Sequence, residues 1–526
     1  MDPTPAPSAG RFAWHPEPEL VGPTDPSARP ALERLGAAAW TAALDYLFDE
    51  ALRRPTTPET YAELRAVFFG PAGGPAATPG APRTAAAVLD EFRRRVAAHS
   101  FNSQHPRQFS YFTPPPLWLS IVGELLAQVT NQGVDVWHSG PSGAFVEEEV
   151  VAWLRGLAGF GEESFGVLTS GGVMANLMAL AIARDVHLGR LLGRSPSEGP
   201  PRGAALEGVR VYASDQAHFS IGRGLDLLGF PPDTLRILPS DGRFRLRAAP
   251  VAAAVRADRV AGRRPLAIAA VAGSTNTGAV DAIPELADLA AAEDLWLHVD
   301  AAYGGGVRLS PREAGRVPDL GRADSVTLDP HKWLFQAYDI GALLVRRRGD
   351  LPATFHRAPE YYRAPEEGQL SPEEEPLHWY QHSLEGTRRF RALKLWLSWK
   401  HLGTEGLARL VEANLAVARH LAGRIASSDD FQALPPEPEL SVVCFRHLPG
   451  GLAAGGFQPG ALDRHQDALQ RALEVSGEGW VSTTRLRGAT WLRAGIVNYL
   501  ATEADADAVL AALRRLAADL PAAPTR

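Results

Sequence analysis

The sequence predicts an α/β layer fold with a mostly parallel sheet. From about residue 105, short apolar runs end in small or polar residues, and each is followed by a segment with helical periodicity, as in alternating strands and helices. The chain has 526 residues, 45% of them hydrophobic and 21% charged, which is enough for more than one core. We therefore expect three parts, at residues 1–104, 105–401 and 402–526.

The first part is expected to be a helical extension. Its first 30 residues are rich in proline, and helical periodicity appears at residues 30–54 and 85–98, with a linker rich in Gly, Pro and Ala at residues 70–82. The first predicted helix has an apolar stripe without a partner in the same part. We therefore expect the extension to pack on another body.

The large middle part contains five predicted strands, and these place the functional site. They span residues 165–168, 209–213, 266–272, 295–299 and 326–328. Chemically competent side chains follow nearly every one of them. Ligands of open α/β sheets bind beyond the carboxyl ends of the strands, so we expect the site at that edge.

The last part is predicted to be a small α+β domain. Periodicity indicates helices at residues 405–426, 460–475 and 503–517, and strands at 440–445, 480–486 and 490–496.

Composition argues against several classes of protein. The net charge is only −7 and basic residues do not interleave with aromatic ones, so a nucleic-acid partner is not expected. No apolar run reaches the roughly 18 residues that span a bilayer, and the N-terminus lacks the features of a signal peptide. Cys444 is the one cysteine, which excludes an internal disulfide and a multi-cysteine zinc site. We expect a cytoplasmic protein with small-molecule partners, no membrane partner and no metal.

Lysine is rare in this chain, which draws attention to each one. Of 53 basic residues, only Lys332, Lys394 and Lys400 are lysines. Lys332 follows a predicted strand, and a lysine amine can form a Schiff base with an aldehyde cofactor, aided by a pKa lowered through burial. A solvated surface lysine is the alternative. The other two lie in the predicted helix 388–401 and are expected to be surface charges.

An acid and a histidine follow two other strands. Asp300 could cap a turn, but a buried aspartate also suits a cation such as a protonated pyridine nitrogen. His218 could be structural, or it could stack on a cofactor ring and touch the substrate carboxylate. With Lys332 for the aldehyde, these residues suggest pyridoxal 5'-phosphate (PLP).

A phosphate cradle is predicted at Ser170, Gly171 and Gly172. They lie between a strand and a helix, where free N–H groups and the helix dipole favour an anion, although such turns often only connect two elements.

These residues resemble the PLP-dependent group II amino-acid decarboxylases, the relatives of aromatic-L-amino-acid decarboxylase. The resemblance runs from about residue 105 to 390 and continues weakly to the C-terminus. It rests on four motifs: SDQAH at 214–218, LHVDAAYG at 297–304, DPHKW at 329–333 and GTRRFRALK at 386–394.

The resemblance implies PLP fold type I and a homodimer with the active site at the subunit interface, in which residues 1–104 wrap the partner. It implies that Lys332 forms the Schiff base, that Asp300 pairs with the pyridine nitrogen and that His218 stacks on the ring. Further residues expected to bind the cofactor or lie next to it are Thr275, Asp281, Ala302 and His331.

The chain departs from the family at the cradle and in one pocket segment. Val173 and Met174 stand where many relatives have a hydroxyl residue and an acid, so we expect Ser170 and Ser325 to help the backbone amides hold the phosphate. Residues 133–139 correspond to a segment that shapes the substrate pocket in the family, but they match it only loosely. The identity of the substrate is therefore the weakest inference from the sequence.

A tyrosine is expected to donate the proton that completes the reaction. Tyr361 lies 29 residues after Lys332 in a segment without apolar periodicity, which predicts a lid. In similar decarboxylases a tyrosine here protonates Cα, whereas relatives with phenylalanine tend towards oxidative deamination. The neighbouring Tyr362 could be the donor instead, and a surface tyrosine without a role is a third reading.

The expected reaction is decarboxylation of an L-amino acid to the amine and carbon dioxide. Tyr111, Phe112, Trp118 and Trp137 favour an aromatic substrate, and Arg107 keeps an acidic one open. The alternatives are an aldehyde-forming oxidative deaminase or aminotransferase on the same scaffold, and a catalytically silent PLP-binding scaffold protein.

Overall fold

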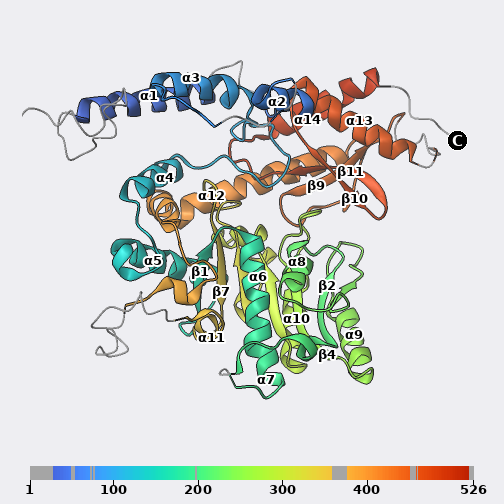
Figure 1. Ribbon diagram of the computed structural model, residues 1–526. Coiled ribbons are helices and arrows are strands. Elements are labelled where there is room, and N and C mark those ends of the chain that lie inside the picture. The colour runs from blue at the N-terminus through green and yellow to red at the C-terminus, as the bar shows by residue number, and fades with distance from the viewer. Residues whose placement is uncertain are drawn as a thin grey trace, which may run out of the picture. The chain divides into compact units, whose positions relative to one another are not determined.

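A computed structural model describes residues 28–48, 54–71, 74, 78–195, 198–357, 376–450, 458 and 460–520 (Figure 1). The chain divides into two compact units: residues 1–108 with 470–480, and residues 109–469 with 481–526. The expected boundaries at residues 104 and 401 stay predictions. Tyr361 and Tyr362 lie outside the described residues.

The smaller unit contains helices α1 (Arg29–Phe48), α2 (Tyr61–Phe69) and α3 (Ala85–Arg95). The hydroxyl of Thr60 caps α2, and Glu63 completes the capping box. Among the described residues of α1 only Ala42 is buried, and large apolar side chains such as Trp40 are exposed. These exposed side chains agree with the expectation that this segment has little core of its own.

The larger unit contains a seven-stranded sheet in the order β1-β7-β6-β5-β4-β2-β3. Its strands are β1 (Phe165–Thr169), β2 (Val209–Ser214), β3 (Leu235–Leu238), β4 (Arg264–Val271), β5 (Trp296–Asp300), β6 (Ser325–Leu328) and β7 (Gly341–Val345). Strand β7 runs antiparallel to both neighbours, and the other pairs are parallel. The five predicted strands and the mostly parallel sheet are confirmed, while β3 and β7 were not predicted.

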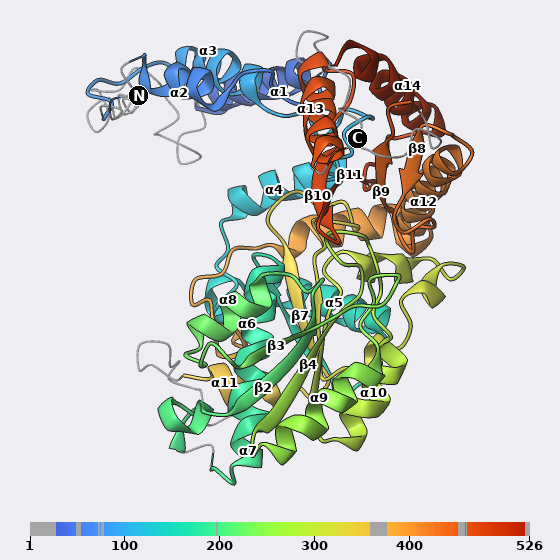
Figure 2. The same cartoon turned by 90° about the vertical axis from the view of Figure 1, so that its right-hand side faces the viewer.

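Helices cover both faces of this sheet, as Figure 2 shows. Helices α6 (Gly172–Ile182) and α8 (Ser220–Leu227) lie on one face, and α9 (Ala248–Val260) and α10 (Ile283–Ala292) lie on the other. Strands β1, β2, β5 and β6 are buried along their whole length, as expected for a sheet covered on both sides. Because these strands are parallel, their carboxyl ends share one edge.

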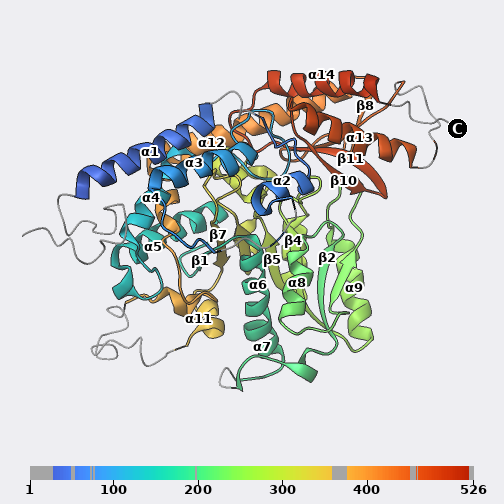
Figure 3. The same ribbon diagram turned by 45° about the horizontal axis from the view of Figure 1, so that its top comes forward.

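The same unit holds a second, antiparallel sheet in the order β10-β11-β9-β8. Its strands are β8 (Phe431–Ala433), β9 (Val442–His447), β10 (Ser482–Leu486) and β11 (Ala489–Gly495), and β8 was not predicted. Helices α12 (Ala392–Ala426) and α14 (Glu503–Asp519) pack beside it (Figure 3). The remaining helices of this unit are α4 (Trp118–Thr130), α5 (Pro141–Ala158), α7 (Gly189–Leu191) and α11 (Asp350–Phe355). Helix α13 (Ala461–Ser476) belongs to this unit up to Leu469 and to the smaller unit from Gln470.

Helix α12 is interrupted at Gly403, where a φ of +65° produces a kink. The expected domain boundary at residue 401 thus falls inside a helix that continues beyond it. In the part of the chain that the structure describes, no helix combines the length and the apolar character needed to cross a membrane.

Candidate active site

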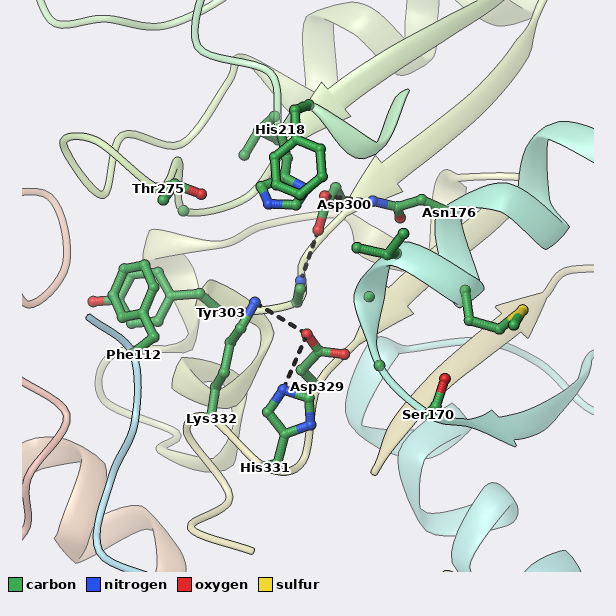
Figure 4. A pocket seen from close by; sticks show the side chains of 18 residues that line it. Phe112, Ser170, Asn176, His218, Thr275, Asp300, Tyr303, Asp329, His331 and Lys332 are labelled. Carbon is green, nitrogen blue, oxygen red and sulfur yellow. Dashed lines mark hydrogen bonds and ion pairs between the residues drawn. The ribbon is translucent and has the colours of Figure 1, made fainter. Parts of the chain in front are cut away.

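The loops that follow the parallel strands converge on a cavity of about 330 Å³ (Figure 4). The structure brings most of the predicted site residues together around it: Ser170, Gly171, Gly172, His218, Thr275, Asp300, Ala302, His331 and Lys332. The other lining residues are Phe112, Val173, Met174, Asn176, Phe219, Val271, Gly273, Tyr303 and Asp329. The cavity lies at the carboxyl edge of the sheet, where the sequence predicts the site.

Lys332 reaches the cavity from the turn that follows β6. Its Nζ atom lies 3.0 Å from Oδ2 of Asp329, as the dashed line in Figure 4 shows. Burial alone would lower the pKa of the Lys332 amine, but the carboxylates of Asp329 and Asp300 outweigh it and raise the pKa. The expectation of a lowered pKa is thus wrong for the free amine, because it considered burial without these two acids.

The other two lysines lie elsewhere. Lys394 is not a surface charge as expected: it is 1% exposed, its Nζ lies 2.5 Å from Glu124, and it donates to the carbonyl of Asp339 at 2.9 Å. Lys400 is partly exposed and pairs with Glu149 at 3.0 Å. Among the described residues, Lys332 is therefore the one lysine that lines the cavity.

Asp300 ends β5 as a buried carboxylate. Its Oδ1 accepts from the backbone N–H of Ala302 at 3.1 Å, and its Oδ2 accepts from Nδ2 of Asn176 at 2.7 Å. No cationic side chain of the described residues forms an ion pair with it. One oxygen thus caps the turn, and the carboxylate as a whole is still available to a cation inside the cavity.

His218 lies near Asp300 on the cavity wall (Figure 4). Its Nδ1 lies 2.8 Å from Oγ of Ser220, and its ring lies 4.1 Å from that of Phe219, between centroids. Burial lowers the pKa of His218, which favours the neutral imidazole.

The turn at Gly171 and Gly172 is shaped by close packing. Gly171 has a φ of +150°, which other residues rarely adopt. A Cβ atom at Gly172 would lie 2.9 Å from Oδ2 of Asp329, and one at Gly171 would lie 3.2 Å from Cε1 of His331. The glycines thus let Asp329 and His331 pack against the turn. Both glycines line the cavity at the N-terminal end of α6, where backbone amides favour an anion such as a phosphate.

Two residues expected to bind or support the cofactor lie outside the cavity. The hydroxyl of Ser325 accepts a hydrogen bond from Nε1 of Trp296 and forms another with Nδ1 of His298, both at 2.9 Å. These bonds hold it inside the sheet, so the expectation that Ser325 binds the phosphate is wrong. Asp281 accepts the backbone N–H groups of Leu246 and Val271, at 2.6 and 2.7 Å. It therefore anchors the backbone, and burial raises its pKa to about 7.

The sequence predicts no role for three residues that lie at or behind the cavity. Asn176 is the one polar side chain in the sequence of α6, a signal that could have found it. Asp329 belongs to the DPHKW motif, which does not by itself predict the contact with Lys332. Arg493 is a charged residue within the apolar strand β11.

Arg493 backs the cavity wall. Its Nε donates to the carbonyl of Thr275 at 2.8 Å, and its guanidinium lies 4.6 Å from the ring centroid of Phe112. Its Nη2 has no hydrogen-bond partner and no acid pairs with it among the described residues, and burial lowers its pKa. This cation therefore supports two lining residues from behind.

The residues present fit PLP. The cavity offers an amine for the aldehyde, a buried carboxylate without a cationic partner for the ring nitrogen, and a glycine turn at a helix N-terminus for the phosphate. The fold and this set of side chains define a PLP enzyme of fold type I.

The chain belongs to the pyridoxal-dependent decarboxylase family, since the model of the pyridoxal-dependent decarboxylase conserved domain matches residues 72–448. It is 31% identical to aromatic-L-amino-acid decarboxylase of Bacillus atrophaeus over 436 residues, which cover 82% of this chain and 85% of that protein. It is 33% identical to L-2,4-diaminobutyrate decarboxylase of Rhizobium meliloti (strain 1021) over 435 residues, 83% and 82% of the two chains.

Among solved structures, the chain is similar to Oryza sativa TDC with PLP and tryptamine. The TM-score is 0.82 at 26% identity, over 92% of this chain and 97% of that chain. The protein is thus a PLP-dependent carboxy-lyase that acts on an amino acid.

Proposed function

We propose that the protein decarboxylates an aromatic L-amino acid to its amine and carbon dioxide. The observation that carries the proposal is an aromatic stack beside the cavity. The rings of Phe112 and Tyr303 lie 4.2 Å apart, and those of Tyr303 and Trp333 lie 4.7 Å apart, as stacked pairs. Two of these rings line the cavity together with Val173 and Met174, and such a lining suits an aromatic side chain.

The roles proposed for the chain's own residues follow from their chemistry. When bound, PLP supplies an electron sink for the electron pair left at Cα after the carboxylate departs. Lys332 provides the amine that attaches the cofactor, and Asp300 keeps a proton on the ring nitrogen. His218 packs against the ring, and Ser170 with the Gly171 and Gly172 backbone holds the phosphate. Thr275, Ala302 and His331 complete the cofactor site.

The donor of the proton to Cα is proposed from the sequence alone. Tyr361 has the position expected of this donor, and Tyr362 is the alternative. A phenol that reaches Cα returns a proton there and favours the amine over oxidised products.

A screen for substrates tests the proposal. The purified holoenzyme is incubated with each standard amino acid and with 2,4-diaminobutyrate, and carbon dioxide and organic products are identified by mass spectrometry. We expect tyrosine, tryptophan or phenylalanine to give the highest kcat/KM, with the amine as product. A preference for glutamate, aspartate or 2,4-diaminobutyrate would contradict the aromatic assignment, and aldehyde with ammonia and peroxide would indicate oxidative deamination.

A matched pair of variants tests the aromatic wall itself. Phe112→Leu shortens the stack, whereas Phe112→Tyr keeps an aromatic ring at the same place. We expect the first to lower kcat/KM for the aromatic substrate by about 10-fold and the second to change it little. Equal effects of the two variants would count against the role of the stack.

The quaternary state and location are also proposed. The family resemblance and the exposed apolar side chains of α1 support a homodimer with the active site at the subunit interface. Light scattering on the full chain tests this, because a monomer at micromolar concentration would contradict it. Cell fractionation tests the proposed cytoplasmic location.

A further inference from the structure

Asn176 lies at the centre of a buried hydrogen-bond network at the wall of the cavity. The residue is 1% exposed, belongs to α6 and lies next to Asp300 in Figure 4. Its side-chain amide contacts residues from β5, β6 and α8, which are far apart in the sequence. An amide has two N–H donors and an oxygen with two lone pairs, so each of its bonds can be assigned a direction.

Both donors of Asn176 are used. Nδ2 donates to Oδ2 of Asp300 at 2.7 Å and to Oγ of Ser220 at 2.8 Å. The reverse orientation of the amide would put its oxygen against the Asp300 carboxylate, where two acceptors would face each other. The carboxylate therefore fixes which end of the amide is the donor.

Both lone pairs of the Asn176 oxygen are used as well. Oδ1 accepts from Oγ1 of Thr327 at 2.6 Å and from Nε2 of His298 at 3.0 Å. His298 must therefore carry its proton on Nε2 and accept on Nδ1 from Ser325. Burial lowers the pKa of His298 to about 4, in agreement with a neutral ring that has one proton to place.

The direction of the bonds continues to His218. Because Ser220 Oγ accepts from Asn176, its own hydrogen is left for Nδ1 of His218, 2.8 Å away. The backbone N–H of Ser220 also points at this nitrogen, at 3.3 Å. Nδ1 of His218 is thus an acceptor, and the neutral ring carries its proton on Nε2.

We propose that Asn176 is a positioning residue that orients the Asp300 carboxylate and sets the tautomer of His218 through Ser220. One amide would thereby hold both the group for the cofactor's ring nitrogen and the ring proposed to stack on the cofactor. The inference rests on the proposed roles of Asp300 and His218.

Losing the amide has two separable consequences. The Asp300 carboxylate keeps its bond from Ala302 but loses the one that fixes Oδ2, so it can rotate. The Ser220 hydroxyl is then free to accept from His218, and the form with a proton on Nδ1 becomes populated. Asn176→Leu should have both consequences. Ser220→Ala should have neither, because it keeps the bond from Asn176 to Asp300 and the backbone N–H at position 220 still donates to Nδ1 of His218.

The tautomer is measured directly in holoenzyme labelled with 15N-histidine. Long-range 1H–15N correlation spectra distinguish the two neutral tautomers, and the spectrum of His218→Gln identifies the His218 signals. We expect the wild type and Ser220→Ala to show a proton on Nε2 alone, because the backbone N–H at position 220 still donates to Nδ1 in that variant. Asn176→Leu and Asn176→Ala should show a mixture of the two tautomers, because the Ser220 hydroxyl can then accept from His218. In Thr327→Val, which removes one bond to the amide oxygen and leaves both donors in place, His218 should keep the wild-type tautomer.

A second measurement tests the effect of Asn176 on the Asp300 carboxylate. The pH dependence of the bound cofactor's visible absorbance should shift in Asn176→Leu and much less in Ser220→Ala. The kcat of Asn176→Leu should fall by about 10-fold or more with little change in KM. An unchanged His218 tautomer in Asn176→Leu would overturn the proposal, and Asn176→Ala decides it if Asn176→Leu does not fold. A non-aromatic substrate in the screen would instead overturn the proposed function and leave this result intact.

Discussion

The Nζ atom of Lys332 lies 3.0 Å from Oδ2 of Asp329, the acid three positions earlier, and Oδ1 of the same carboxylate is buried without a hydrogen-bond partner among the described residues. Asp329 also lies against Gly172 in the proposed phosphate cradle. A single acid therefore influences both the amine and the anion site of the cavity.

This relationship predicts the pH dependence of cofactor attachment. Asp329 contributes to the raised pKa of Lys332, and only the neutral amine can attack the aldehyde, so attachment should speed up as the pH rises. Asp329→Asn should lower the pKa and allow faster attachment near pH 7, by about 10-fold for each unit of the shift. The rate is followed by absorbance as PLP is added to apoenzyme. The two proteins should converge at high pH, and identical rates at neutral pH would contradict the role of Asp329.

Asp300→Asn should separate binding from turnover. The amide is nearly the same size but cannot hold a proton on the ring nitrogen, so cofactor content should stay close to that of the wild type. The kcat should fall by about 100-fold or more. Cofactor content by absorbance and initial rates of carbon dioxide release check both parts, and near-normal turnover would remove Asp300 from the proposed role.

Arg493→Met should loosen the aromatic wall. The variant removes the cation over Phe112 and the bond to the Thr275 carbonyl, but keeps a long apolar side chain. We expect KM for the aromatic substrate to rise by about 3- to 30-fold, the equivalent of roughly 0.5–2 kcal/mol. Steady-state kinetics measure this, and an unchanged KM would show that Arg493 has only a structural role.

Tyr361→Phe should change the products more than the loss of carbon dioxide. Without the phenol, Cα stays unprotonated long enough to react with dioxygen, so the variant should form less amine and more aldehyde, ammonia and peroxide. Mass spectrometry and a peroxide assay give the ratio. Tyr362→Phe is the matched control; if it changes the products while Tyr361→Phe does not, the donor has been misassigned by one residue.

Much of this site could be predicted because its residues follow strand ends in sequence. Asp300 and Lys332 each come after an apolar run, and parallel strands bring such positions to one edge. Strand β7 was missed because it follows the Lys332 loop closely and returns antiparallel, without the helix that marks the other strands.

The contact partners of individual side chains could not be predicted from the sequence. Lys394 has the spacing of a surface residue, yet α4 covers it, because Gly123 allows the two helices to approach so closely that a Cβ atom there would lie 2.6 Å from Cα of Lys394. Likewise, Asn176 stands out as a polar residue in an apolar helix, but its four partners come from other elements and only the fold identifies them.

The most direct test of the central claim is to find which lysine carries the cofactor. Borohydride reduction of the holoenzyme fixes PLP to the amine that holds it, and peptide mass spectrometry then locates the modified residue. We predict the label on Lys332 in the wild type and no labelled peptide in Lys332→Ala, because Lys394 and Lys400 are paired with Glu124 and Glu149 away from the cavity. Label on Lys394 or Lys400, or label that persists in Lys332→Ala, would contradict the account.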